Sequence, residues 1–348
     1  MKIRPTTQKQ IPGLLLGGAV GDAMGLPAER MSAEQIARRW PGGLKHRFVF
    51  GRGMISDDTE HAAMTAQALI VAAGDVEKFR RCLGWKLRWW FLALPAGVGL
   101  ATARACMRLW FGISPERSGV YSAGNGPAMR SAVIGAAFAN DEPKRREFVA
   151  ASTRLTHTDP RAEIAALAVA EAAAWIVRGD PREQFQGRLP VLSKDDEWLR
   201  VCMLIDDGLS SEQSVKQFAE ALGLKSAVTG YAFHTVPVAL FAWLRHRRDY
   251  GEALQSVIRC GGDTDTTAAI TGSLAGCEVG REGIPSEWLD DLKDWPRSKD
   301  WLGCVALRLA ESDSQKSVRL FWPGIIPRNL FFLATVLVHG LRRMLPPY

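Results

Sequence analysis

Residues 261–272 read GGDTDTTAAITG, which places two aspartates two positions apart between a glycine pair and an alanine-rich run. Side chains two positions apart in a helix point to nearly opposite sides, so both carboxylates converge only in a turn before the helix begins. Gly261 and Gly262 suit such a turn, and the dipole of the following helix favours anionic groups at its start. The stretch indicates either an ordinary helix cap, for which Asp and Thr are preferred residues, or a ligand site at a helix end.

A second helix start repeats this chemistry. In ISDDTEHAAMTAQAL, residues 55–69, Ser56, Asp57 and Asp58 precede an alanine-rich helical pattern. A cap needs one oxygen-bearing side chain, whereas two adjacent carboxylates repel each other, and a bound cation relieves that repulsion. The pattern therefore favours metal ligands in this turn.

A third acidic segment, GGAVGDAMGLPAE at residues 17–29, brings Asp22 and Glu29 into a glycine-rich setting that lets the backbone approach a ligand. Three oxygen-rich turns attached to apolar helices are what a helical bundle needs to build one metal site at helix ends. Carboxylate and hydroxyl oxygens suit Mg²⁺, Mn²⁺ or Ca²⁺ better than zinc. The number of carboxylates predicts two ions, which in such sites lie about 3.5 to 4 Å apart.

Two further loops have the composition of ligand contacts. In YSAGNGPAMRSAVIGAAF, Gly124, Asn125 and Gly126 precede a helical pattern and can present backbone N–H groups to phosphate, although the same residues make ordinary turns. LTHTDP places His157 in a polar loop, where a histidine satisfied by its neighbours is the alternative to a ligand contact.

Helical patterns dominate the rest of the chain, and alternating strand patterns are scarce. The clearest helix, 160–178, has Asp159 as a cap, Pro160 at its first position and Gly179 after its end. We predict further helices at 59–73, 126–139, 211–222, 231–246 and 264–276, a buried apolar terminal helix at 330–340, one short strand at 46–50 and a long loop at 181–196. No linker or repeat divides the chain, so the prediction is a compact all-α single domain over residues 1–348.

Composition narrows the class of protein. Of the 348 residues, 47% are hydrophobic and 23% are charged, which is typical of a folded globular protein. The six cysteines have no paired CxxC spacing, which argues against a disulfide scaffold or a zinc site and favours reduced, mostly buried thiols. A net charge of +7 favours an anionic substrate or partner.

The sequence also bears on location and on large partners. No apolar run approaches the roughly 18 residues that span a bilayer, and Asp22 interrupts the one segment with the character of a signal peptide. We therefore expect a cytoplasmic protein with no membrane partner. Segments 40–52 and 78–108 mix Trp with Arg and Lys, which fits a nucleic-acid surface or a core equally well. Because no nucleic-acid-binding motif accompanies them, we predict no nucleic-acid partner.

Taken in order, five segments resemble the motifs of the ADP-ribosylglycohydrolase family, of the dinitrogenase reductase-activating and ADP-ribosyl-acceptor hydrolase type. They are GGAVGDAMGLPAE, SDDTEHAAM, SAGNGPAMRSA, LTHTDP and GGDTDTTAAITGSLAG. The ordered set, spread over residues 11–280, is much more specific than any one motif, while residues 281–348 have no counterpart in it. The resemblance implies a compact all-helical domain with a two-metal centre, usually of magnesium or manganese, at helix N-termini.

The resemblance also implies roles for individual residues. The implied metal ligands are Ser56, Asp57, Asp58, Asp263, Asp265 and Thr266, with Asp265 as the bridging carboxylate. The implied catalytic carboxylates, which activate water, are Glu29, Asp57 and Asp58. The positions implied to line an ADP-ribose pocket are Gly97, Gly99, Ser122, Gly124, Asn125, Gly126 and His157.

The implied reaction is hydrolysis of the bond between C1 of the distal ribose of ADP-ribose and a protein side chain. We predict arginine as that side chain, an ADP-ribosylated protein as the substrate, and reversal of a regulatory or toxin-catalysed modification as the purpose. In the latter, immunity role, an ADP-ribosyltransferase toxin is a further expected partner. The alternatives are a hydrolase of serine-linked, poly- or small-molecule ADP-ribose, or a non-catalytic relative that binds ADP-ribose or a toxin.

Two departures from the family pattern bear on the acceptor and on adenosine contacts. The loop PAGVGLATA, residues 95–103, lacks the acidic residue that many arginine-directed relatives carry there. Ala123 stands where some relatives have an aromatic residue. Neither departure removes an implied metal ligand.

Overall fold

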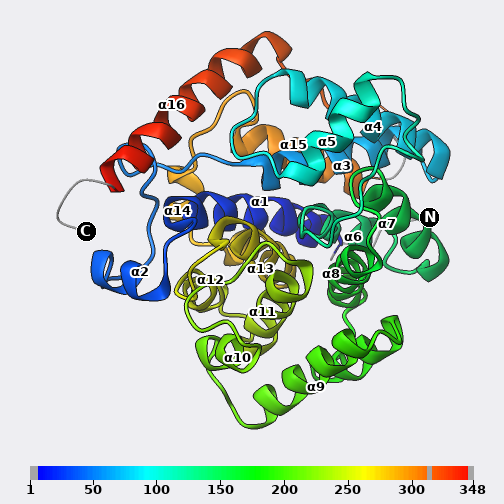
Figure 1. Cartoon of the computed structure of the whole chain (residues 1–348). Coiled ribbons are helices and arrows are strands. Elements are labelled where there is room, and N and C mark those ends of the chain that lie inside the picture. Colours follow the sequence, from blue (N-terminus) through cyan, green and yellow to red (C-terminus); the bar gives the residue numbers. More distant parts are fainter. Residues whose placement is uncertain (1–6, 312–315, 344–348) are drawn as a thin grey trace.

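The structure is a computed structural model that describes residues 7–311 and 316–343, and it consists of helices joined by turns and loops (Figure 1). The α-helices are α1 (Thr7–Gly25), α2 (Ala33–Arg39), α3 (Asp57–Ala72), α4 (Val76–Leu92), α5 (Leu100–Trp110), α6 (Ala132–Ala137), α7 (Glu142–Arg154), α8 (Pro160–Arg178), α9 (Asp196–Ser210), α10 (Val215–Ala221), α11 (Ala232–Arg245), α12 (Tyr250–Ile258), α13 (Thr264–Val279), α14 (Ser286–Asp291), α15 (Lys299–Ala310) and α16 (Ile325–Arg343). Short 3₁₀ helices are η1 (Leu26–Ala28), η2 (Ala128–Arg130), η3 (Arg182–Gln184), η4 (Gln186–Leu192), η5 (Arg281–Gly283) and η6 (Trp322–Gly324). Extended segments of the described chain pair only at isolated bridges, so the predicted all-α fold is confirmed.

Two antiparallel helices, α1 and α13, form the centre of the molecule (Figure 1). Their backbones lie close together because both contact faces carry glycine. A Cβ atom on Gly17 would lie 2.4 Å from the carbonyl oxygen of Gly272, and one on Gly25 would lie 2.3 Å from that of Thr264. The glycines of the segment 17–29 therefore serve the contact with α13, which corrects the prediction that they face a ligand. They bring the end of α1 to the start of α13.

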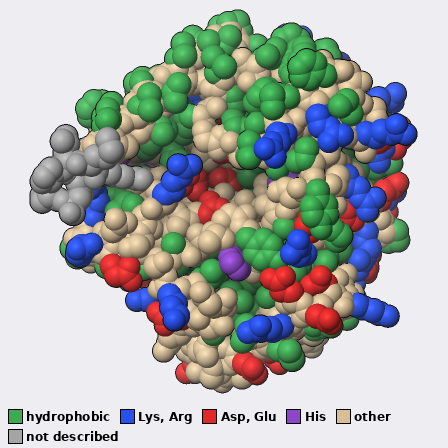
Figure 2. Space-filling view, in the orientation of Figure 1, with side chains coloured by type: hydrophobic (Ala, Val, Ile, Leu, Met, Phe, Trp, Pro, Cys, Tyr) green, Lys and Arg blue, Asp and Glu red, His purple; other side chains and the backbone are tan. Residues whose placement is uncertain are grey.

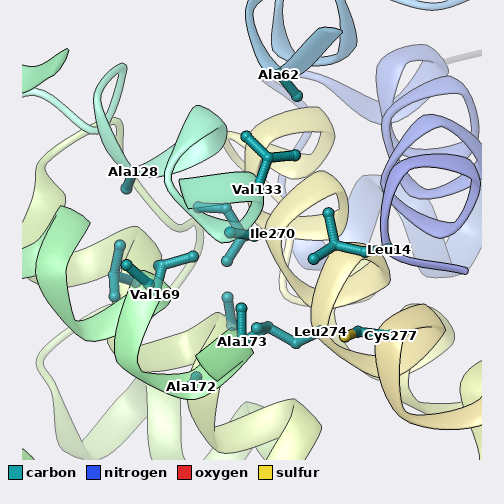
Figure 3. Close-up of a cluster of buried hydrophobic side chains, with 14 of the residues drawn as sticks. Leu14, Ala62, Ala128, Val133, Val169, Ala172, Ala173, Ile270, Leu274 and Cys277 are labelled. Atoms are coloured by element: carbon teal, nitrogen blue, oxygen red, sulfur yellow. The ribbon is translucent and has the colours of Figure 1, made fainter. Parts of the chain in front are cut away.

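Several other helices pack directly against this pair. Helices α3 and α15 contact α1, whereas α8, α11 and α12 contact α13. Figure 3 shows side chains of α1, α3, η2, α6, α8 and α13, among them Leu14 and Ile270, gathered in a common interior. One connected cluster of buried apolar side chains extends from Ile11 to Ala310. The extent of the domain, residues 1–348, stays a prediction.

Several predictions of local structure are confirmed. The helix predicted at 160–178 is α8, and the Asp159 side chain caps it by accepting a hydrogen bond from the Arg161 N–H. The helices predicted at 59–73, 231–246 and 264–276 agree with α3, α11 and α13 within three residues at each end. All six cysteines are free, and four of them are buried.

The strand predicted at 46–50 is wrong. Val49 pairs only with Arg52, in a single bridge, and the intervening Phe50 and Gly51 have φ angles of 48° and 79°. These positive φ angles reverse the chain immediately, so the β-branched and aromatic residues of this stretch have no neighbouring strand to pair with.

Two predicted helices are shorter than their patterns indicate. The helix predicted at 126–139 is divided into η2 and α6. The helix predicted at 211–222 begins only at Val215, because Ser214 caps it with its hydroxyl. The predicted loop 181–196 contains η3 and η4 and leads into α9, a helix that the sequence analysis missed.

The terminal helix is the largest correction. The sequence predicts a buried apolar helix at 330–340, and α16 does cover this segment. It lies across the outside of the molecule (Figure 1), and its buried side carries polar residues such as Asn329, which is 1% exposed. The stretch Trp322–Arg342 is long and apolar enough to cross a membrane, yet only 28% of it is buried in the protein, whereas the comparable stretch Lys9–Ala28 is entirely buried.

Candidate functional site

A cavity of about 480 Å³ opens beside the starts of α3 and α13 and the turn that follows α1. Figure 2 shows a hollow near the middle of this face with acidic side chains inside it. The walls come from distant parts of the chain, which include the loop between α4 and α5, residues 122 and 124–126, residues 228–230, and residues 262, 263, 265 and 266. This cavity is the candidate functional site.

The start of α13 places two aspartates in the cavity wall. Gly261 and Gly262 have φ angles of 72° and 85°, which confirms the predicted turn before this helix. Asp263 occupies the N-cap position, but its side chain makes no capping hydrogen bond and instead accepts one of 2.6 Å from the Asn125 amide. Asp265 lies inside the first helical turn, not before it as predicted, and both carboxylates reach the cavity because Asp263 is not helical. The presence of an aspartate at position 263 is therefore not explained by helix capping.

The start of α3 is a cluster of buried oxygens. Ser56 caps the helix, with its hydroxyl accepting a hydrogen bond from the Asp58 N–H and donating one of 3.2 Å to the Asp58 carboxylate. The Thr266 hydroxyl, from α13, donates to the same carboxylate oxygen at 3.2 Å. From α1, Asp22 accepts hydrogen bonds of 2.9 and 3.2 Å from the N–H groups of Ser56 and Thr59. The three acidic segments of the sequence therefore meet.

Burial and mutual repulsion raise the pKa values of this cluster. The pKa values of Asp57, Asp58 and Asp265 lie well above the usual range, first because burial disfavours the charged form and then because neighbouring carboxylates repel one another. Burial also raises the pKa of Asp22 to about 6, against the hydrogen bonds from Thr59 and Ser56 that lower it. Within residues 7–311 and 316–343, no lysine or arginine forms an ion pair with these aspartates. When these aspartates are ionised, no direct ion pair with a described lysine or arginine offsets their charge.

The donor set fits a hard divalent cation. Atoms Oδ1 of Asp22 and Oδ1 of Asp58 are buried without a hydrogen-bond partner, and such oxygens are costly unless something binds them. Carboxylate and hydroxyl oxygens are the ligands that Mg²⁺ and Mn²⁺ prefer. As they lie, no three His, Cys, Asp or Glu side chains in the described part of the chain converge on one point as ligands, so cation binding requires some of them to rotate.

Residues 122–126 form another part of the wall. The Gly124 N–H donates to the Ser122 hydroxyl at 3.3 Å, and the Asn125 N–H donates to the carbonyl oxygen of Gly230 at 3.0 Å. Because both N–H groups already have protein partners, the prediction that this loop presents its N–H groups to phosphate is wrong for Gly124 and Asn125.

A buried arginine organises the neighbourhood of His157. The Thr156 hydroxyl accepts a hydrogen bond of 2.7 Å from Arg130 and lies 2.9 Å from Nδ1 of His157. Burial, and then the Arg130 charge, lowers the pKa of His157 to about 3. The imidazole is therefore neutral at neutral pH and offers the cavity a polar edge without a charge. Burial also lowers the pKa of Arg130 itself, to about 10.

The loop between α4 and α5 forms one edge of the cavity. Gly97 has a φ angle of 81°, and a Cβ atom there would lie 4.0 Å from Oδ1 of Asp57. Leu100 and Thr102 line the same edge and are 65% and 5% exposed. The loop therefore reaches the acidic cluster with backbone and apolar groups.

All but two of the predicted site residues line the cavity. Those in its wall are Glu29, Asp57, Gly97, Gly99, Ser122, Gly124, Asn125, Gly126, His157, Asp263, Asp265 and Thr266. Ser56 and Asp58 lie behind the wall. Asp58 accepts a hydrogen bond from Thr266, which lines the cavity, and Ser56 bonds Asp58. Their roles as ligands or catalytic groups stay predictions.

Sequence reasoning missed several residues of the wall. These are Arg30, Leu100, Ala101, Thr102, Met129 and the turn 228–230. The turn contributes mainly its backbone, because the carbonyl oxygen of Val228 accepts a hydrogen bond of 2.9 Å from the Asp263 N–H. The residue types in this turn do not indicate a functional site. Its position directly before a predicted helix is the one feature of the sequence that could have indicated it.

The fold and the site define an all-helical protein with a carboxylate-rich cavity where helix ends meet. The profile of one family, ADP-ribosylglycohydrolase, matches residues 4–318. The chain therefore belongs to the ADP-ribosylglycohydrolase family, and this membership supports ADP-ribosyl hydrolase activity.

Individual relatives agree with this assignment. The ADP-ribosyl-[dinitrogen reductase] glycohydrolase of Rhodospirillum rubrum is 27% identical over 295 residues, which cover 83% of this chain and 92% of the relative. The ADP-ribosylarginine hydrolase Tri1 of Serratia proteamaculans is 26% identical over 303 residues, which cover 80% and 74%. A solved structure described as an ADP-ribosylglycohydrolase-related protein complex is 26% identical, with a TM-score of 0.62 over 89% of this chain and 99% of that one.

Proposed function

We propose that this protein is a divalent-cation-dependent hydrolase that releases ADP-ribose from arginine side chains of modified proteins. The observation that carries the proposal is the meeting of three helix ends, where buried aspartates gather at one cavity without a lysine or arginine partner in the described residues. Arginine is supported by the relative from Serratia proteamaculans, whose name specifies ADP-ribosylarginine.

The residues that would hold the cations come from α3 and α13. They are Ser56, Asp57, Asp58, Asp263, Asp265 and Thr266. Bound there, divalent cations would supply positive charge that orients ribose hydroxyls and a water molecule. Asp22 would position these ligands, because the hydrogen bonds that it accepts from the N–H groups of Ser56 and Thr59 fix the start of α3.

Glu29 is the carboxylate best placed to handle a proton. It lines the cavity, and its side chain is 32% exposed, so it can exchange protons with solvent. In the proposed reaction the oxygen of water forms a bond to C1 of the ribose, and the C1–N bond breaks with its electron pair staying on nitrogen. Positive charge develops on the sugar ring and is stabilised by the nearby carboxylates. Glu29 takes the proton that water loses and returns it to the leaving nitrogen.

The rest of the wall suits the neutral and anionic parts of ADP-ribose. His157 is uncharged at neutral pH and can donate or accept a hydrogen bond, while Gly97 and Gly99 let the loop between α4 and α5 follow the ligand closely. The chain carries a net charge of +7, which favours the approach of a diphosphate.

Release of ADP-ribose from an arginine-modified protein, measured with Mg²⁺, with Mn²⁺ and with a chelator, tests the proposal. We expect cation-dependent release that falls by roughly a hundredfold or more in Asp263→Ala and in Asp265→Ala. Asp195→Ala is the matched control, because this aspartate lies at the N-cap position of α9, as Asp263 does in α13, but outside the cavity. Release from a serine-modified protein alone would show that arginine is the wrong acceptor, and release from neither substrate would favour a non-catalytic binder.

The biological purpose stays a prediction. Reversal of a toxin-catalysed modification can be tested by producing the protein in cells with an arginine-specific ADP-ribosyltransferase. Protection that is lost in Asp265→Ala would mean that hydrolysis protects, whereas protection that persists would mean that the protein blocks the transferase by binding it. The cytoplasmic location stays a prediction as well.

A further inference from the structure

Helix α16 turns polar side chains inward. Arg328 donates hydrogen bonds of 3.0 and 2.6 Å to the two carboxylate oxygens of Asp294, and it lies 3.5 Å from Glu60. Next to it, the Asn329 amide donates to the carbonyl oxygen of Ala93 at 2.7 Å. All these side chains are buried, so α16 is fastened to the rest of the protein by specific polar bonds and is held at its surface.

The outward side of the same helix is apolar. Its large exposed side chains are Ile326, Leu330, Phe331, Leu333, Leu337, Val338 and Leu341, each at least 38% exposed. From Ile326 to Leu341, no exposed residue of α16 is charged. A surface helix of a soluble protein normally presents its polar side to water, so this side requires an apolar environment.

The apolar side of α16 continues onto α4 and α5. Ala93, which α16 binds through Asn329, lies between Leu92 and Leu94, and these are 50% and 61% exposed. Trp85, Trp89 and Trp110 are exposed on the same pair of helices, and Trp89 contacts each of the other two edge to face. Figure 2 shows hydrophobic side chains along the whole upper edge, over α16, α4 and α5. We call this surface the apolar face.

The two segments that form the apolar face contain no acidic residue. Residues 78–112 include Lys78, Arg80, Arg81, Lys86, Arg88, Arg104 and Arg108 but no Asp or Glu, and residues 316–343 include Lys316, Arg319, Arg328, Arg342 and Arg343 but no Asp or Glu. Of these basic side chains, Arg81, Arg104, Lys316, Arg319 and Arg342 are exposed. A surface that combines exposed Trp, Phe and Leu with exposed basic side chains complements a layer of anionic lipid headgroups over acyl chains.

A lipid surface fits the apolar face better than a protein partner does. Protein interfaces carry about one hydrogen bond per 100–200 Å². The exposed side chains of α16 from Ile326 to Leu341 include no hydrogen-bonding group, and the half-buried Thr335 bonds within the helix, to the carbonyl oxygen of Phe331. Acyl chains require no such bonds.

We propose that the apolar face docks the protein on an anionic membrane surface, with α16 lying in the plane of the interface. The proposal replaces the expectation of no membrane partner, and it stands independently of the proposed function. The acidic hollow opens toward the viewer in Figure 2 while the apolar face lies along the upper edge, so docking leaves the cavity open.

Flotation of the full chain with lipid vesicles tests the proposal. We expect binding to vesicles of phosphatidylcholine and phosphatidylglycerol in equal parts, weaker binding to phosphatidylcholine alone, and partial release by salt. The double variant Phe331→Glu with Leu337→Glu should lower the affinity for the mixed vesicles by roughly a hundredfold, because burial of each such side chain contributes about a factor of ten or more. Both side chains are exposed, so the variant should melt at the temperature of the parent.

Two further variants keep the result interpretable. Phe331→Ser with Leu337→Ser removes the apolar groups without adding charge, and it should also lose binding. Met203→Glu on α9 is the matched control, because Met203 is 61% exposed but lies outside the apolar face, and it should bind like the parent. A parent protein that fails to float with the mixed vesicles at low salt would overturn the proposal. So would a parent dimer in analytical ultracentrifugation that the glutamate variant dissociates, because a second copy would then cover the face.

Discussion

Asn125 decides where the Asp263 carboxylate points. Its amide donates hydrogen bonds of 2.6 Å to Asp263 and 2.9 Å to the Thr235 hydroxyl, and thus joins the wall of the cavity to α11 and α13. A group that orients a metal ligand typically contributes about ten- to a hundredfold to metal affinity. Asn125 therefore belongs to the support of the site as much as to its lining.

We predict that Asn125→Leu raises the Mg²⁺ concentration needed for half-maximal activity by about tenfold, with a smaller loss of rate at saturating Mg²⁺. A titration of hydrolysis against Mg²⁺ measures this. Ser122→Ala is the control, because Ser122 lines the same wall and, among the described residues, its hydroxyl bonds the Gly124 N–H alone. Equal Mg²⁺ requirements for the two variants would contradict a role of Asn125 in fixing Asp263.

His157 makes stability depend on pH. Its pKa is about 3 in the folded protein and near 6.5 in an unfolded chain, so the unfolded state takes up the proton first as the pH falls. The contribution of the neutral ring is fully present above pH 6.5 and is lost by about 1.4 kcal/mol per pH unit as the pH falls from there toward 3.

We predict that the parent protein loses about 2 kcal/mol more unfolding free energy than His157→Gln does between pH 7 and pH 5. Urea unfolding of both proteins at the two pH values measures the difference, and the titration of the aspartate cluster cancels because both proteins share it. Equal losses would mean that His157 already takes up its proton in the folded protein at these pH values.

The contact between α1 and α13 depends on the absence of side chains. A Cβ atom on Gly17 would meet a backbone carbonyl oxygen, which cannot move aside as a flexible side chain does, whereas one on Gly303 of α15 would have nothing within 4 Å. The same substitution should therefore have opposite signs at these two helical positions.

We predict that Gly17→Ala destabilises the protein by about 1 to 3 kcal/mol or more, because α1 must move away from α13. Gly303→Ala should stabilise it by about 0.5 to 1 kcal/mol, because alanine is the better helix former. Chemical unfolding of the two variants measures both effects. Tolerance of Gly17→Ala would show that the two helices have room to separate.

Helix boundaries could be predicted where cap chemistry is explicit, as at Asp159 before α8. The sequence could not predict which side of a helix faces the core and which side faces the solvent. In α16, periodicity shows which residues share a face, but burial of Arg328 depends on Asp294, which lies 34 positions earlier in the chain. A pattern of apolar residues therefore predicts an apolar side of α16 without saying that this side faces outward.

At the scale of the whole molecule, the sequence predicts the parts of the site that depend on chemically distinctive side chains. It does not predict residues that contribute only backbone groups, such as Val228, whose carbonyl oxygen accepts a hydrogen bond from the Asp263 N–H. It also does not predict residues outside the cavity that support the site through other residues. Arg328 is of the second kind: through Asp294, which accepts a hydrogen bond from the Ile55 N–H, it fixes the segment that leads into the start of α3. Such supports depend on the completed fold.

Because the aspartate cluster joins α1, α3 and α13, cation binding should affect the stability of the whole protein. We predict that Mg²⁺ at about a hundred times its dissociation constant adds about 2.7 kcal/mol to the unfolding free energy and raises the melting temperature by several degrees. Asp58→Asn should remove most of this increment. Without Mg²⁺ the same variant should melt higher than the parent, because it removes a buried charge that its neighbours repel.

Asp294→Asn separates this effect from the general consequence of changing a buried aspartate. Asp294 is paired with Arg328, so its loss leaves a buried cation with a weaker partner and should destabilise the protein by up to about 3 to 5 kcal/mol. The Mg²⁺ increment should nevertheless persist in Asp294→Asn, because its pairing with Arg328 leaves it no part in holding the cation. Thermal melts of the parent, Asp58→Asn and Asp294→Asn with Mg²⁺ and with a chelator measure the predicted changes. Without Mg²⁺, Asp58→Asn should melt higher than the parent and Asp294→Asn lower. A full Mg²⁺ increment in Asp58→Asn would exclude Asp58 as a cation ligand, and no increment in the parent would mean that the buried carboxylates are held protonated instead of bound to Mg²⁺.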